Sequence, residues 1–121
     1  MARVERREAV RIPAKLAMEI QIGGENSARV RSLNVSANGV YFSSSRYIPV
    51  LTKLDITLDL PLADDEDAKG ESVVCRGVVV RTEPEEEREG QDEYQIACYF
   101  TSIDEADRET LESYILKQVA F

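Results

Sequence analysis

Apolar and polar residues alternate along short stretches of this sequence, and the alternation predicts β-strands. One stretch of roughly 14–22 carries an apolar residue at every second position from Leu16 to Ile22. A second stretch, about 27–35, alternates in a similar way. The segment Gly23-Gly24-Glu25-Asn26 between them is typical of a turn. The pattern therefore predicts a hairpin in which each strand buries one face.

Similar patterns predict further strands at 40–42, 54–60, 73–81 and 94–100. The stretch 54–60 alternates cleanly, so one of its faces should be buried and the other should face water. The stretch 73–81 is dense in β-branched residues, which predicts a strand covered on both faces. Polar segments at 43–53, 64–67 and 83–93 are rich in serine or acidic residues and predict the connecting loops.

The C-terminal segment changes to a helical period. Ser102-Ile103-Asp104-Glu105 fits a capping box, and Leu111, Tyr114 and Ile115 then recur at helical spacing. This pattern predicts a helix of about 104–118 whose apolar stripe packs on the sheet. Six or so short strands followed by one helix predict a mainly β fold, namely a six-stranded antiparallel split barrel with a C-terminal α-helix.

The length of 121 residues suits one domain with a substantial core. No apolar run approaches the roughly 20 residues that a membrane span requires, and no signal segment opens the sequence. We therefore expect a cytoplasmic protein that does not insert into membranes. Residues 1–10 are charged and poor in large apolar groups, so we expect a flexible arm there and the barrel domain at 11–121.

Charge is distributed unevenly along the chain. The net charge is −8, which argues against a general DNA- or RNA-binding protein. Residues 1–53 hold nine Lys or Arg and four Asp or Glu, for +5, whereas residues 54–121 hold six and nineteen, for −13. A basic N-terminal half on an acidic protein indicates one local anion site.

The two cysteines, Cys75 and Cys98, lie in apolar strand-like runs, so we expect buried, reduced thiols. The sequence contains no histidine and no closely spaced pair of cysteines. This composition predicts neither a metal site nor a resident cofactor.

Three arginines near the N-terminus form the first candidate motif. Arg6, Arg7 and Arg11 fall within six residues, and in an extended arm Arg7 and Arg11 point to the same side. A guanidinium can read the O6 and N7 edge of guanine, stack on a purine and pair with phosphate. A cluster of this kind can instead be a solvated tail whose surface ion pairs contribute little energy.

The second candidate motif is Asn34-Val35-Ser36-Ala37-Asn38-Gly39. Asn34 and Ser36 are two residues apart, so at a strand end their short polar side chains share a face. Gly39 suits a backbone that needs a positive φ or the close approach of a ligand. The segment also fits an ordinary turn that caps its own backbone, with Asn38-Gly39 as a common hairpin pair.

The remaining polar and aromatic residues suggest less. The acidic residues lie in solvated runs, and none is paired with a candidate nucleophile, so we expect no enzymatic activity. Aromatic side chains could stack on nucleic-acid bases. They occupy apolar strand positions, however, which favours a place in the core; they are Tyr41, Phe42, Tyr94, Tyr99 and Phe100.

The two motifs together, in a small β-rich chain with a C-terminal helix, resemble the PilZ domain, a bacterial receptor for cyclic di-GMP. In that family an RxxxR motif on the N-terminal arm and a [D/N]xSxxG motif after the second strand grip the nucleotide. Arg7 and Arg11 match the first motif, and Asn34, Ser36 and Gly39 match the second. The resemblance covers nearly the whole chain and implies that these residues contact the ligand.

Arg6 carries a finer implication of the same resemblance. A basic residue just before RxxxR accompanies binding of an intercalated cyclic di-GMP dimer in the family, whereas an apolar residue there accompanies a single molecule. Arg6 therefore favours the dimer. Asn34 stands where the family often has Asp, which leaves a neutral hydrogen-bonding group.

The resemblance implies a receptor whose arginine arm closes on cyclic di-GMP and alters a surface seen by an effector protein, with motility, biofilm or exopolysaccharide output. An exposed barrel or helix face could also pair two copies of the chain. One alternative is a PilZ-like adaptor of pilus or motility machinery that does not bind the nucleotide. A nucleic-acid-binding barrel and a split-barrel flavin enzyme are more distant alternatives.

Overall fold

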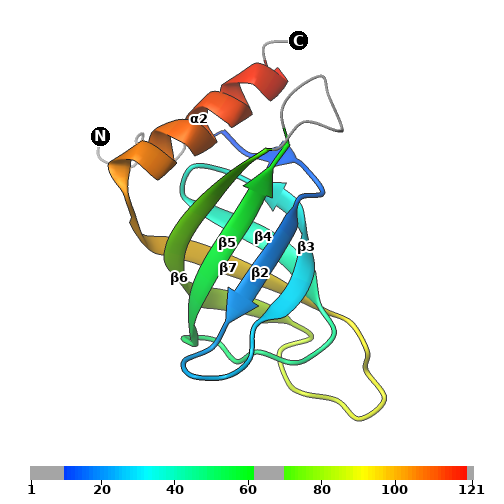
Figure 1. Cartoon of the computed structure of the whole chain (residues 1–121). Coiled ribbons are helices and arrows are strands. Elements are labelled where there is room, and N and C mark those ends of the chain that lie inside the picture. The colour runs from blue at the N-terminus through cyan, green and yellow to red at the C-terminus, as the bar shows by residue number, and fades with distance from the viewer. Residues whose placement is uncertain (1–9, 62–69, 120–121) are drawn as a thin grey trace, which may run out of the picture.

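The computed structural model describes residues 10–61 and 70–119 of the chain. Seven strands and one helix follow one another in these ranges (Figure 1). They are β1 (Ile12–Pro13), β2 (Ala17–Gln21), β3 (Ala28–Val35), β4 (Gly39–Ser44), β5 (Lys53–Leu60), β6 (Glu71–Glu83), β7 (Tyr94–Ile103) and α2 (Glu105–Val119). The predicted boundaries of the main strands and of the helix differ from these by at most three residues.

The strands form a closed antiparallel barrel. Their order is β1-β3-β2-β5-β6-β7-β4, and a further pairing of β3 with β4 closes the sheet on itself. Six strands make up the closed barrel, and the two-residue β1 adds to the end of β3. This confirms the predicted six-stranded barrel with a C-terminal helix. Closure leaves no long unpaired edge in the described part of the sheet.

Inward-facing apolar residues from every long strand fill the barrel, as the alternating sequence predicts. The largest fully buried side chains are Phe42, Met18, Ile48, Leu54, Ile56, Leu58, Ile96 and Leu111. Cys75 and Cys98 are free and buried among them, which confirms the prediction for the thiols.

One strand differs from its prediction. We expected residues 73–81 to be covered on both faces, but β6 buries only alternate residues, and this expectation was wrong. Val74 is 57% exposed and Val80 is 52% exposed. β-Branched residues fit an extended backbone on a solvated face as well as on a buried one, so their density does not report two-sided burial.

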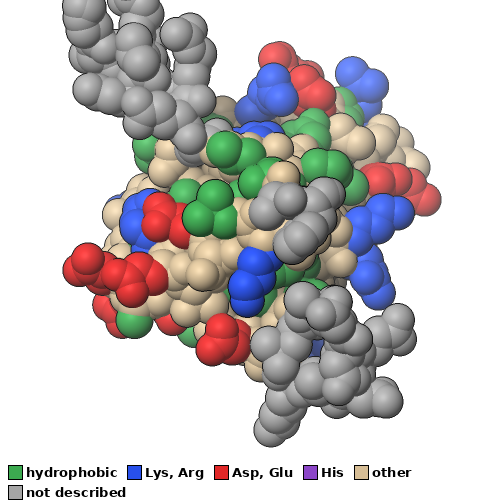
Figure 2. Space-filling model, turned by 90° about the horizontal axis from the view of Figure 1, so that it is seen from above, with side chains coloured by type: hydrophobic (Ala, Val, Ile, Leu, Met, Phe, Trp, Pro, Cys, Tyr) green, Lys and Arg blue, Asp and Glu red, His purple; other side chains and the backbone are tan. Residues whose placement is uncertain are grey.

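Helix α2 lies across one end of the barrel (Figure 1) and inserts Leu111 and Ile115 into the core. Acidic residues in its first turn complement the helix dipole, and Asp107 also accepts a hydrogen bond from the Val74 N–H at 3.1 Å. Figure 2 shows apolar side chains exposed at this end between scattered acidic and basic ones. No helix among the described residues combines the length and apolar character of a bilayer span.

A buried serine lies beside the segment that separates β1 from β2, and β1 precedes the predicted strand of roughly 14–22. The Ser32 hydroxyl donates to the Ala14 carbonyl and accepts from the Leu16 N–H at 2.8 Å, in addition to the backbone bonds from Ser32 N–H to Leu16 O and from Ala14 N–H to Leu33 O. The β3–β4 register shifts at the same place, between Ser32 and Asn34. On the other edge of β3, the register changes by one residue between β2, where Ala17 lies opposite Arg31, and β1, where Pro13 lies opposite Asn34.

The turn before β5 holds a strained residue. Leu51 has a φ of 77°, and the bonds Thr52 N–H to Pro49 O, Leu51 N–H to Val79 O and Val79 N–H to Thr52 O form a turn followed by a bulge. Glycine usually occupies this position, because a side chain there costs about 1–2 kcal/mol. Leu51 is 75% exposed, so little burial offsets the strain.

Replacing Ser32 with alanine should lower the free energy of unfolding by about 1–3 kcal/mol, because the mutation leaves the Leu16 N–H and the Ala14 carbonyl without their partner. Urea unfolding measures the change. Ser45→Ala, at an exposed serine, serves as the control and should have little effect. Equal stabilities of the two variants would contradict the bridging role of Ser32.

Replacing Leu51 with glycine should raise the free energy of unfolding by about 1 kcal/mol, because glycine adopts a positive φ without strain. Thermal and urea unfolding report the gain. Val50→Gly, which changes an exposed neighbour outside the left-handed region, should not stabilise the protein. A loss of stability in Leu51→Gly would show that the φ of Leu51 is not strained.

Candidate functional site

The two candidate motifs meet where β1 pairs with the end of β3. Ile12 lies opposite Val35 and Pro13 opposite Asn34, which brings Arg11 beside the second motif. The Arg11 Nη1 donates a hydrogen bond to Asn34 Oδ1 at 2.5 Å, across 23 positions of sequence. Arg6 and Arg7 lie outside the described residues. The structure therefore brings together one arginine of the first motif and the residues of the second.

Ser36 and Asn38 build the turn between β3 and β4. The Ser36 N–H donates to the Gly39 carbonyl at 2.9 Å, and the Ser36 Oγ accepts from the Asn38 N–H at 3.1 Å. Ser36 is 1% exposed. Its hydroxyl thus caps the turn from within, as in the ordinary turn that the sequence also allowed.

The glycine at position 39 is not explained by a positive φ, which was one of the two reasons that we expected for it. The φ of Gly39 lies outside the left-handed region. Among the described glycines, Gly23 and Gly90 are the ones with a positive φ. A Cβ at Gly39 would instead collide with the Cys98 carbonyl oxygen of β7. Glycine is required here because the backbones of β4 and β7 approach closely at the start of their pairing.

These residues form one wall of an open groove of about 500 Å³. Arg11, Asn34, Ser36 and Gly39 line it together with Asn38. The facing wall comes from β4, β6 and β7 and consists of Val40, Tyr41, Val80, Arg81, Ala97, Cys98 and Tyr99. Four of the six predicted site residues thus share one cavity.

Arg81 gives the groove a second cationic side chain. Its guanidinium lies 6.0 Å from the centre of the Tyr41 ring, within range of a cation–π contact. The Tyr41 hydroxyl donates to Gln95 Oε1 at 2.9 Å, which fixes the ring. Arg81 also lies 4.0 Å from Glu83, but both side chains are more than half exposed, so this pair is weak.

The electrostatics of the groove favour an anion. Arg11 and Arg81 are its charged lining residues, and no acidic side chain is among the described residues that line it. Burial, together with the nearby Cys75, raises the pKa of the Cys98 thiol to about 12, so the thiol adds no negative charge at neutral pH. The groove therefore presents two guanidinium groups, short hydrogen-bonding side chains and two tyrosine rings.

Sequence reasoning missed the facing wall. We expected Tyr41 and Tyr99 in the core, but Tyr41 is half-buried and Tyr99 is 53% exposed. The other three aromatic candidates, Phe42, Tyr94 and Phe100, are buried as expected. The alternation of strand residues could have predicted this exposure. Phe42 and Phe100 face inward, so the residues directly before them, Tyr41 and Tyr99, must face outward. Arg81 had no comparable signal, since a bulge between Val79 and Arg81 sets its direction.

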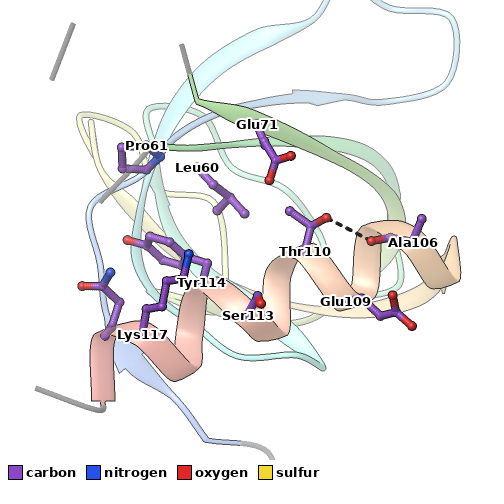
Figure 3. A pocket seen from close by; sticks show the side chains of 10 residues that line it. Leu60, Pro61, Glu71, Ala106, Glu109, Thr110, Ser113, Tyr114 and Lys117 are labelled. Atoms are coloured by element: carbon purple, nitrogen blue, oxygen red, sulfur yellow. Dashed lines mark hydrogen bonds between the residues drawn. The ribbon is translucent and has the colours of Figure 1, made fainter. Parts of the chain in front are cut away.

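A second groove, of about 450 Å³, lies between α2 and the ends of β5 and β6 (Figure 3). The labelled side chains around it include Glu71, Glu109, Tyr114 and Lys117. It mixes both signs of charge and contains no residue of either motif. The groove at Arg11 and Asn34 is therefore the better candidate site.

Comparison with known proteins places the chain in a family. The model of the PilZ domain matches residues 5–117. No curated protein sequence matched the chain.

Solved structures with the same fold were also found. The inhibitor of motility MotI/DgrA of Bacillus subtilis aligns with a TM-score of 0.76 at 20% identity, over 95% of this chain and 52% of its own. The complex of MrkH of K. pneumonia with c-di-GMP aligns with a TM-score of 0.68 at 15% identity, over 95% of this chain and 53% of the MrkH chain. The PilZ domain of YcgR from Escherichia coli with c-di-GMP aligns with a TM-score of 0.66 at 11% identity, over 95% of this chain and 92% of the YcgR chain. The chain thus spans about half the length of the first two proteins, and at these identities the likeness shows the fold.

Replacing Gly39 with alanine should lower the free energy of unfolding by about 1–3 kcal/mol, because the new methyl group meets the Cys98 carbonyl of β7. Gly24→Ala is a matched control, since a Cβ at Gly24 meets nothing within 4 Å. Urea unfolding of both variants measures the difference. If Gly39→Ala is as stable as Gly24→Ala, close packing of β4 on β7 is not the reason for the glycine.

Proposed function

This chain belongs to the PilZ domain family, and we propose that it is a receptor for cyclic di-GMP that binds in the groove between Arg11 and Arg81. The observation that carries the proposal is the convergence of Arg11, Asn34, Ser36 and Gly39, the described residues of both family motifs, on one groove. The structures of MrkH and YcgR contain c-di-GMP, which supports the same ligand class here.

The chemistry of the groove suits a guanine nucleotide with phosphodiester groups. A guanidinium can form paired hydrogen bonds with phosphate or with the O6 and N7 edge of guanine. The rings of Tyr41 and Tyr99 offer surfaces on which a base can stack. The amide of Asn34 can donate to and accept from a polar base edge once Arg11 turns to the ligand.

The N-terminal arm completes the proposed mechanism. Arg6 and Arg7 stand five and four positions before Arg11, whose side chain already lines the groove. In the proposal the arm closes over the bound nucleotide, and its new position alters the surface offered to an effector protein. Arg6 favours an intercalated dimer of the nucleotide. In this proposal the chain binds the nucleotide without catalysing a reaction, and the effector protein produces the cellular response.

Calorimetric titration with cyclic di-GMP tests the function. We expect saturable binding, weakened about 10-fold to 100-fold by Arg11→Ala or Arg7→Ala, because each mutation removes a charge-assisted contact. Arg29→Ala removes the same charge from an exposed site outside the groove and should leave the affinity within about twofold. Two nucleotides per chain would support the dimer, and one would support a single molecule.

Two outcomes would contradict the proposal. A cyclic dinucleotide with adenine bases that binds equally well would exclude guanine recognition. The absence of any heat with the wild-type chain at high nucleotide concentration would exclude the receptor. In that case the adaptor that binds a partner protein without the nucleotide becomes the better function.

A further inference from the structure

Helix α2 reaches the wall of the candidate groove through Arg108. The Arg108 Nη1 donates a hydrogen bond to the Ala37 carbonyl at 3.3 Å, across 71 positions of sequence, and the side chain is half-buried. Ala37 lies inside the turn formed by Ser36 and Gly39. The helix that covers the barrel end is thus bonded to the turn that carries the second motif.

Arg108 is an unusual residue for its place in the helix. The first turn of a helix favours acidic side chains, and α2 follows this rule with Glu105 and Asp107. Arg108 stands among them, and it is the one basic residue between Glu89 and Leu116. The helix dipole disfavours a cation near the start of a helix, so helix stability does not explain an arginine at this position. The hydrogen bond to Ala37 gives Arg108 a different role.

The turn is held on its outer side by two elements. The Asn38 carbonyl accepts a bond from the Phe100 N–H of β7 at 2.8 Å, and the Ala37 carbonyl accepts the bond from Arg108. Two neighbouring peptide groups of the turn therefore depend on β7 and on α2. A change in the turn must alter one of these bonds.

The helix also packs on the strand that follows the other motif. α2 packs against β1, which directly follows Arg11, and the bond from the Val74 N–H to Asp107 ties its first turn to β6. Both sequence motifs thus have a contact with α2 or with the strand next to it. The start of α2 lies close to the site without lining the groove.

We propose that Arg108 couples occupancy of the groove to the position of α2; this rests on the proposed function. A ligand held by Asn34 and the Ser36–Gly39 turn fixes the orientation of the Ala37 peptide. That orientation favours the helix position in which Arg108 bonds to Ala37. Since coupling between sites is reciprocal, a helix held in this position also favours the ligand.

Hydrogen exchange of the full chain, with and without cyclic di-GMP, tests the coupling. In the wild type we expect the ligand to slow amide exchange at 34–40 and, about threefold or more, at 105–112. Arg108→Ala should abolish the effect at 105–112 and weaken binding about threefold to tenfold. Lys117→Ala removes the same charge from the last turn of α2 and should preserve both.

The outcomes separate this inference from the proposed function. If the wild type binds the nucleotide but exchange at 105–112 does not change, or if Arg108→Ala behaves like Lys117→Ala, the coupling is overturned and the receptor stands. If the wild type binds no nucleotide, the proposed receptor function is wrong. The contact between Arg108 and Ala37 is then tested in the protein without nucleotide. Arg108→Ala must then speed exchange at 37–39 relative to Lys117→Ala, and equal exchange would overturn the role of Arg108 as well.

Discussion

The candidate groove depends on the irregular pairing of β3 near its end. The Ser32 hydroxyl bonds to the Ala14 carbonyl and to the Leu16 N–H, and the register to β4 shifts between Ser32 and Asn34. The register on the other edge of β3 changes by one residue between β2 and β1, and the pairing of β1 sets Arg11 against Asn34. If the register of β2 with β3 continued unchanged, Pro13 would lie opposite Val35 in place of Asn34. The buried hydroxyl of Ser32 thus binds the segment between β1 and β2, where the register that brings Arg11 to Asn34 is set.

The sequence predicted the parts of the structure that local pattern determines. Alternation located the main strands, and a change to helical spacing located α2, because one face of each element must be buried. The motif residues Arg11, Asn34, Ser36 and Gly39 were identified from residue type, and the structure places them in one groove. Their role in ligand binding stays a prediction.

The remaining features depend on contacts between distant segments. Arg81 reaches the groove because of a bulge opposite β7, and Gly39 is required by the Cys98 carbonyl. Neither contact has a local signature, since each depends on the register of two strands that are far apart in sequence. The exposure of Val74 and Val80 was also missed, because β-branched residues are favoured in strands on either face.

Several hydrogen-bonding groups of the site have partners within the protein. Asn34 accepts from Arg11, the Ser36 hydroxyl accepts from Asn38, and the Ala37 carbonyl accepts from Arg108. A ligand at this site must therefore exchange bonds as well as add them, and each exchange contributes only about 0.5–1.5 kcal/mol. Under the proposed function, much of the affinity must then come from charge and stacking. Arg11 and Arg81 supply the charge within the groove on a chain whose net charge is −8, so the local field opposes the overall charge.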